Sequence, residues 1–567
     1  MTIQPKAKIG RRTLSFYFFV LIGLVLHGFS SLWNVDPYHE GALFPTAVGI
    51  AQGLSVFDEI NQQYGFLGPL FVSVLVKVFG NYLIIQRLFG LLLIAILFFL
   101  FYSNLKRLCS IPTARFIVIL WLFVSPVWSW PNGRSALSGG YWPNQIGTML
   151  VLTALLLLHK RESKLNLLFA GIFVFIASQA RMEFYFVWFA FVVSVALLLG
   201  KRAVFFLLGS FIGISFTFLY LLSQGSVEEW FKQTILVWTL TPPDVPKIGA
   251  NFFIFNSLNF FGITSIAISL ILLANLLNRY NFSTWLKLTF ITLITGAMFS
   301  TSSLITFTLN FKSFSISSYI RYILENTLFS WVNLTILAFL ILLSLFLIKK
   351  RFQIKTILKE FGLAQTGIIA SCLGTLGLFH NFNPDYSQMV WSLYILGLLV
   401  ISKKFPILNI SRSLESLKLV SIATCLVSFC VFFVHANNQR FPYETQMLKG
   451  LYGDSEKVVN ELDLSFAEIS NYARPRNMLM VCQTGLFSVS HYGYLGSDKW
   501  SWNQQPEIMI SNRFNNLEVG QTILACKLNR GDARTISQLI EKQVITEIVN
   551  NPRFKMYRVM KQYQQLE

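Results

Sequence analysis

Residues 14–45 read LSFYFFVLIGLVLHGFSSLWNVDPYHEGALFP. The first part, residues 14–33, is almost entirely apolar, and about 20 such residues form a helix long enough to cross the bilayer core. Asp36, His39 and Glu40 follow at once, so two acids and a histidine lie where the chain leaves the apolar run. The stretch therefore predicts a membrane-spanning helix that leads into a charged loop at the membrane surface.

The composition of the whole chain also indicates a membrane protein. Of its 567 residues, 54% are hydrophobic and 13% are charged, whereas a soluble globular protein has about 25% charged residues. Long apolar runs recur, among them LLLIAILFFLFY, AVFFLLGSFIGISFTFLYLL and WVNLTILAFLILLSLFLI. These features predict an all-α polytopic membrane protein.

The chain is basic, with 46 lysines and arginines against 26 acids and a formal net charge of +20. A nucleic-acid partner is one explanation of such a charge. However, the basic residues lie in short clusters between apolar runs, as they do in the cytoplasmic loops of membrane proteins. No basic stretch is interleaved with aromatic residues in the manner of a nucleic-acid groove. The pattern therefore predicts a lipid bilayer, and no nucleic acid, as the partner.

About 13 membrane spans are predicted, with the N-terminus in the cytoplasm and the loop 33–81 outside. No span contains an aspartate or a glutamate, as the cost of placing a charge in lipid requires. No small-residue cleavage site follows the first apolar run, so we expect this run to stay as an anchor. The predicted spans are 14–32, 82–102, 113–130, 142–158, 165–179, 184–200, 203–222, 253–277, 286–305, 328–348, 362–379, 387–401 and 419–435.

Residues 436–567 differ in character from the predicted membrane domain, residues 1–435. This tail has no apolar span, and helix-like stretches such as SEKVVNELDLSFAEISNYA alternate with strand-like ones such as GQTILACKL. An odd number of spans places this small α/β domain on the outer side. Cys482 and Cys526 each lie on a predicted strand, which leaves a disulfide and two buried thiols as open alternatives. No cysteine or histidine spacing typical of a zinc site is present.

The first outer loop, residues 33–81, is predicted to stay close to the membrane. Its stretch EGALFPTAVGIAQG is expected to form an amphipathic helix along the interface. The stretch GPLFVSVLVKVFG is nearer the length of an interfacial or re-entrant helix than that of a span. Asp58 and Glu59 lie between the two. A loop of this kind can hold acids at the membrane surface.

Carboxylates in this position suit sugar transfer. A carboxylate can take the proton from an acceptor hydroxyl while the hydroxyl attacks the anomeric carbon, which is a general-base role. A second acid or a histidine can orient the acceptor, or hold a divalent cation such as Mg²⁺ or Mn²⁺ that neutralises a phosphate leaving group. Arg87, Arg134 and Arg181 are candidates for binding the phosphate of a lipid-borne donor.

The order of motifs in this region resembles a known family. A basic N-terminus and one helix are followed by D-x-x-H-E-G, G-x-x-x-F-D-E, QYG-x-x-GPL, a helix that ends in FG and a helix that opens with QR. This order is similar to that of the polytopic GT-C glycosyltransferases, which include aminoarabinose transferases and protein O-mannosyltransferases. The match covers about residues 33–95. The alternating topology and the exported α/β tail extend it loosely over the whole chain.

The resemblance implies an activity and a set of catalytic residues. Members of the family take a sugar from a polyprenyl-phosphate carrier and have an essential acid in the first outer loop, and Asp36 matches that acid. Asp36 is therefore the expected base, with Glu40 and His39 as its catalytic neighbours. Many relatives have two adjacent acids here, whereas Asp36 and Glu40 are separated. The pair Asp58–Glu59 therefore stays open as an alternative base.

Substrate-binding residues are expected further along the first loop and in other outer loops. The resemblance implies that Gln63 and Tyr64 face the donor and that Arg87 binds its phosphate. Arg134 lies near tryptophans and a tyrosine, whose aromatic faces suit a sugar or a polyprenyl chain. The remaining candidates for substrate binding are Asp58, Glu59, Arg181, Glu183, His380 and Asp385.

Each candidate also has a plainer explanation. Asp36, Glu40 and Asp58 are residue types that cap helix N-termini, and Arg181 and Glu183 are suited to a structural ion pair. His380 and Asp385 fit an ordinary polar turn at the interface. Only the first-loop cluster has a whole string of matching motifs around it.

The sequence thus predicts an inverting glycosyltransferase in a bacterial inner membrane. It would move a hexosyl or pentosyl group from a polyprenyl-phosphate carrier to a glycan, lipid or protein acceptor on the periplasmic side, in the assembly of the cell envelope. A transporter or flippase for a lipid-linked sugar is the first alternative, disfavoured because no acid lies inside a span and no internal repeat is visible. A polysaccharide polymerase or ligase is the second, disfavoured because such proteins usually have their key residues in a large loop late in the chain.

Overall fold

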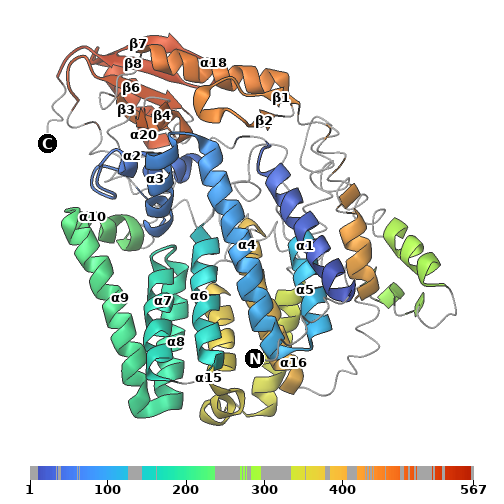
Figure 1. Ribbon diagram of the computed structural model, residues 1–567. Helices are drawn as coiled ribbons and strands as arrows, with labels where there is room; N and C mark the ends of the chain where they lie inside the picture. Colours follow the sequence, from blue (N-terminus) through green and yellow to red (C-terminus); the bar gives the residue numbers. More distant parts are fainter. Residues whose placement is uncertain are drawn as a thin grey trace, which may run out of the picture.

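The computed structural model is mostly helical, with small β-sheets near the C-terminus (Figure 1). The described residues are 11–33, 40–60, 64–124, 143–160, 163–236, 283–294, 334–351, 353–376, 384–404, 418–427, 440–453, 455–472, 478–482, 485–490, 517–526 and 530–562, together with single residues and short pieces between them.

The helices before residue 436 follow the apolar runs of the sequence. They are α1 (Arg11–Ser30), η1 (Glu40–Ala42), α2 (Phe44–Ala51), α3 (Leu67–Phe79), α4 (Leu83–Leu108), α5 (Ile111–Val124), α6 (Pro143–Lys160), α7 (Lys164–Ser178), α8 (Glu183–Leu199), η2 (Gly200–Arg202), α9 (Ala203–Ser223), α10 (Val227–Phe231), η3 (Lys232–Leu236), α15 (Ile354–Gly374) and α16 (Pro384–Lys404). Further helical stretches are Thr284–Ile294, Leu334–Lys349 and Lys418–Val427.

Within the described residues, three helical stretches are long and apolar enough to cross a membrane: Thr13–Ser30, Leu83–Leu108 and Glu183–Ser223. The third contains α8 and α9, which η2 joins. The other apolar helices in the described part are shorter, for example Lys164–Ser178. The chain is therefore a membrane protein, but the predicted count of about 13 spans is not confirmed.

The predicted span at 362–379 begins at a break in α15. The helix α15 begins at Ile354, and Gly362, with φ 70° and ψ 174°, interrupts it. Before this glycine, Ile357 and Phe361 are buried and Lys359 is exposed, so this part of the helix is amphipathic. The apolar part of α15 follows this break, so the hydropathy pattern places the start of the apolar helix correctly.

Two glycines bring α7 and α9 into close backbone contact. A Cβ on Gly171 would lie 2.1 Å from the carbonyl oxygen of Phe206, and one on Gly209 would lie 1.9 Å from that of Leu168. Small residues at such positions let helices in a membrane approach each other closely. The sequence pattern of the two helices therefore sets how tightly they pack.

We expect Gly209→Ala to lower the thermal stability of the detergent-solubilised protein, by about 1–3 kcal/mol, because overpacking forces the two backbones apart. The matched control is Gly28→Ala on α1, where the new Cβ would lie 3.7 Å from the Leu91 Cδ2 atom, an ordinary contact. Thermal melting of both variants beside the wild type is the measurement. Equal melting temperatures for the two variants would contradict the close contact.

The region after residue 436 contains the helices and strands that the sequence predicts there. The main sheet has the order β3-β6-β8-β7, in which β3 and β6 are parallel and the other pairs are antiparallel. The elements are β1 (Phe441–Pro442), η5 (Gln446–Leu448), β2 (Tyr452–Gly453), α18 (Glu456–Tyr472), β3 (Met478–Cys482), η6 (Gly485–Ser488), β4 (Val489–Ser490), β5 (Gly493–Tyr494), β6 (Thr522–Cys526), α20 (Arg530–Glu541), β7 (Ile545–Asn550) and β8 (Lys555–Val559).

Of the two alternatives for the tail cysteines, the structure favours the disulfide. Cys526 is disulfide-bonded, and Cys482 is the residue opposite it in the register of β3 and β6. Cys109, Cys372, Cys425 and Cys430, which precede the tail, are free thiols.

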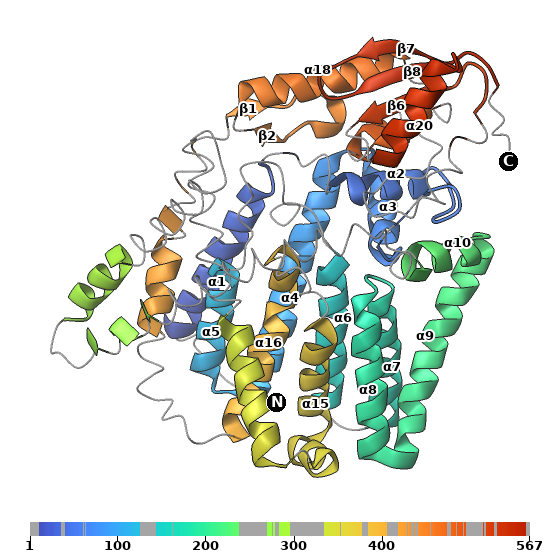
Figure 2. The same ribbon diagram turned by 180° about the vertical axis from the view of Figure 1, so that it is seen from behind.

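The sheet region covers one end of the helical part, and α2 and α3 lie between the two in both views (Figures 1 and 2). One hydrophobic core joins the three layers, because it contains Leu43 and Val48 from the first loop as well as Leu486 and Met556 from the C-terminal region. The part of the first outer loop that contains η1 and α2 is thus enclosed between the helices and the C-terminal region.

This enclosure corrects the prediction for EGALFPTAVGIAQG. We expected an amphipathic helix along the interface, but every residue of α2 from Phe44 to Gly49 is buried. The apolar face of α2, which was predicted to contact lipid, is instead covered by protein. The other predicted helix, α3, buries Val72 and Val76 and exposes Phe71, Val74 and Val78. Its exposed residues are apolar apart from Lys77 in the last turn.

Candidate functional site

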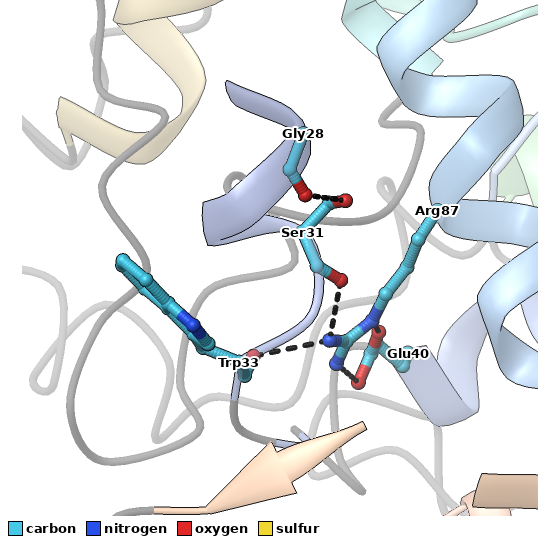
Figure 3. Close-up of polar contacts among 5 residues, drawn as sticks. All are labelled: Gly28, Ser31, Trp33, Glu40 and Arg87. Carbon is cyan, nitrogen blue, oxygen red and sulfur yellow. Dashed lines mark hydrogen bonds and ion pairs between the residues drawn. The ribbon is translucent and has the colours of Figure 1, made fainter. Parts of the chain in front are cut away.

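The candidate site begins where α1 ends and α4 begins. The last turn of α1 is closed by side chains, because the Ser30 Oγ donates to the His27 carbonyl at 3.0 Å and the Ser31 Oγ to the Gly28 carbonyl at 2.6 Å. The chain then turns at Trp33 towards Glu40, which opens η1. Arg87, in the early part of α4, lies beside both ends of this connection (Figure 3).

Arg87 and Glu40 form a buried ion pair with two hydrogen bonds. The Arg87 Nε donates to the Glu40 Oε1 at 2.7 Å, and the Nη2 donates to the Oε2 at 2.9 Å (Figure 3). The two side chains are 4% and 1% exposed. Paired N–H donors on a carboxylate are strong and directional, and a buried charge of this kind is stable only with its partner in place.

The same guanidinium also binds the backbone just after α1. The Arg87 Nη1 donates to the carbonyl oxygens of Ser31 and Trp33, each at 3.0 Å (Figure 3). Both residues are buried, and a buried backbone carbonyl group needs a hydrogen-bond partner. Arg87 therefore fastens the chain before the candidate segment 34–39 as well as after it.

Several predicted site residues lie outside the described residues. They are Asp36, His39, Gln63, Arg134 and His380. Asp385 lies in the first turn of α16. Val35, the described residue beside Asp36, is buried in the core that joins the first loop to the C-terminal region.

Asp58 and Glu59 lie in an exposed turn and not at the start of a helix. The Phe57 N–H donates to the Ile60 carbonyl at 2.8 Å, and the Glu59 carboxylate accepts from the Ser55 N–H at 2.7 Å. The suggested helix cap at Asp58 is therefore wrong, because the chain folds back on itself here. This turn packs against the end of α9 through Phe57 and Leu221, whereas Glu40 packs against α4.

A second group of predicted residues does come together. The Arg181 Nε lies 2.7 Å from the Glu183 Oε2, and the Arg181 guanidinium lies 5.2 Å from the centre of the Tyr64 ring. The backbone contact beneath them requires glycine, because a Cβ on Gly65 would lie 1.7 Å from the carbonyl oxygen of Gln179. The first loop is thereby fastened to the turn between α7 and α8.

Sequence reasoning missed a third connection, made by Gln62 and Gln233. The Thr46 Oγ1 donates to the Gln62 Oε1 at 2.9 Å, and the Gln233 Oε1 accepts from the Gln62 N–H at 3.0 Å. The Gln233 Nε2 donates to the Phe57 carbonyl at 2.6 Å. This chain of bonds joins α2, the turn at 56–60 and η3, and no local sequence pattern announces it.

Sequence reasoning also missed a set of buried polar side chains at the starts of α4 and α6. They are Gln86, Asn144, Gln145 and Thr148, and each has no exposed surface. A signal was available for Gln86, since a polar residue inside an apolar run is a candidate functional residue by default.

The described residues contain no group of three or more histidines, cysteines and acids that could hold a metal ion.

No protein-family model and no curated protein matches this chain. Similar solved structures include ArnT from Cupriavidus metallidurans bound to undecaprenyl phosphate, at 13% identity and a TM-score of 0.44, with 96% of this chain and 98% of that chain covered. The apo state of ArnT is 12% identical, with a TM-score of 0.44 and coverage of 97% and 98%.

An oligosaccharyltransferase from Archaeoglobus fulgidus, in complex with zinc and sulfate, is 9% identical. Its TM-score is 0.37, and the match covers 96% of this chain and 73% of that chain. At these identities and TM-scores the similarity by itself assigns no activity to the chain.

Proposed function

We propose that this protein is a membrane glycosyltransferase of the GT-C type. It transfers a sugar from a polyprenyl-phosphate carrier to an acceptor on the outer face of a bacterial inner membrane, where residues 436–567 also lie. The observation that supports the proposal is the set of contacts that Arg87 makes with described residues on both sides of the predicted first-loop motif. Arg87 binds Ser31 and Trp33 before the segment 34–39 and Glu40 after it, and Val35 lies in the core that joins the membrane helices to the C-terminal region.

In the proposed reaction Asp36 is the base. Its carboxylate takes the proton of an acceptor hydroxyl while the oxygen forms a bond to the anomeric carbon. The bond from that carbon to the phosphate oxygen breaks, and the carrier phosphate leaves with the electron pair. A single displacement of this kind inverts the configuration at the anomeric carbon. His39 is proposed to orient the acceptor.

Cationic and aromatic side chains are proposed to bind the donor. Arg134 and Arg181 are the candidates for its phosphate, and Tyr64, which lies against Arg181, is the candidate for the sugar or the first isoprene unit. His380 and Asp385, the latter in the first turn of α16, are proposed to contact the acceptor.

The test is transfer by the purified protein in liposomes, with a panel of radiolabelled polyprenyl-phosphate sugars and crude envelope material as acceptor. We expect label to move from the lipid into the acceptor, with inverted anomeric configuration. A transporter would instead move the lipid-linked sugar across the liposome membrane without breaking the glycosyl bond. Translocation of intact donor without transfer would refute the proposal.

A further inference from the structure

The sequence resemblance assigns Glu40 a catalytic role and Arg87 a role in binding the donor phosphate, but the geometry points to a different task. We propose that Arg87 and Glu40 are positioning residues that fix both ends of the segment 34–39, and that Arg87 does not bind the donor. This inference rests on the proposed function for the role of Asp36. The contacts of Arg87 with Ser31, Trp33 and Glu40, here called the clamp, can be tested without measuring sugar transfer.

The contacts of Arg87 span the segment. On one side, its Nη1 binds the carbonyl oxygens of Ser31 and Trp33, and on the other its Nε and Nη2 bind the two carboxylate oxygens of Glu40. One rigid, planar guanidinium therefore holds Trp33, before the segment, at a fixed distance from Glu40, after it. Because the ends of a short segment limit where its middle can lie, this grip restricts Asp36 although Arg87 is remote in sequence.

Binding of the donor phosphate by Arg87 is disfavoured by the same contacts. All three nitrogens of the guanidinium are engaged, and Glu40 is only 1% exposed. A phosphate that took the place of the carboxylate would leave a buried negative charge without its partner, which is strongly destabilising. It would also add a second negative group next to that charge.

The C-terminal region holds the same two ends. The Tyr452 N–H donates to the Leu32 carbonyl at 2.8 Å, and Trp33 forms a β-bridge with Tyr452. On the far side of the segment, η1, which Glu40 opens, packs against η6. Each end is therefore tied both to α4 and to the C-terminal region. These contacts fix the residues that flank the segment, and misplacement of a catalytic group by 1 Å can cost a factor of about 100 in rate.

The test uses a double variant, Arg87→Met with Glu40→Met, and a single variant, Arg87→Lys. Replacing a buried ion pair by apolar side chains of similar size is often neutral for stability, so the double variant separates the loss of the grip from a failure to fold. The matched control is Lys555→Met with Glu547→Met, which removes an exposed pair on β7 and β8 with a distance of 3.1 Å. Thermal melting checks the folding of every variant.

For the double variant we expect kcat for sugar transfer to fall at least about tenfold, with the KM for the donor and its Kd changed less than about threefold. Arg87→Lys keeps the charge but not the planar fork of the guanidinium. It should likewise lower kcat and leave the KM and Kd for the donor nearly unchanged. A residue that binds the phosphate would instead raise the donor Kd when replaced. A tenfold weaker donor affinity in Arg87→Lys, or an unchanged kcat in the double variant, would overturn the inference.

Amide hydrogen exchange gives a readout that needs no activity. In the double variant the peptide that covers residues 31–43 should exchange at least about ten times faster than in the wild type, while the control variant should match the wild type. If the wild type transfers no sugar from any donor, the proposed function fails, and this measurement still decides the clamp. Unchanged exchange in residues 31–43 would refute it.

Discussion

Asp36→Asn is expected to lower the rate of sugar transfer by at least about 100-fold, because a positioned general base contributes about 10²–10⁴ to a rate. Asparagine has nearly the same shape as aspartate but cannot accept the acceptor's proton. The donor Kd should change little, since the carboxylate acts on the acceptor. The measurement is the initial rate of transfer at saturating donor, beside donor binding and thermal melting of the same preparation.

Asp58→Asn is the matched comparison for this prediction. Asp58 lies in an exposed turn that packs against the end of α9, away from α4, so we expect its rate to stay within about threefold of the wild type. This comparison also settles the alternative that the sequence left open. A large loss in Asp58→Asn together with normal transfer by Asp36→Asn would move the base to the 56–60 turn.

Phe487→Ala is expected to lower the free energy of unfolding of the C-terminal region by about 3–5 kcal/mol, as loss of a large buried aromatic side chain usually does. Phe487 is 1% exposed, and its ring lies 5.1 Å from that of Phe466 and 6.0 Å from that of Phe554. It belongs to η6, which packs against η1 and α2. The variant should therefore loosen both the C-terminal region and the first outer loop.

Limited proteolysis and thermal melting measure this effect. We expect faster cleavage of the C-terminal region and a lower melting temperature, and the rate of transfer should fall with them because one of the two anchors of the segment 34–39 is lost. Val458→Ala on α18 is the control, since Val458 is 45% exposed and little surface is uncovered by its loss. Normal proteolysis of Phe487→Ala would show that the joint core does not hold the C-terminal region.

The sequence predicted those features that depend on one segment at a time. Most of the long apolar runs became helices, and α18, α20 and the strands of the main sheet lie where the pattern after residue 436 placed them. Errors arose where the surroundings decided the outcome. The helix α2 looked amphipathic but is covered on all sides, because the C-terminal region packs where water or lipid was expected.

Local sequence by itself determined that this chain enters a membrane and that acids follow its first helix, since hydropathy and charge act through the solvent around a single stretch. Only the tertiary structure decided what those residues touch. Arg87 and Glu40 are 47 residues apart and form one buried ion pair. Tyr64, which precedes α3, lies against Arg181, which lies between α7 and α8. A buried charge is stable only beside a partner of opposite charge. The packing of the helices decides which residue that partner is, and distance along the chain does not.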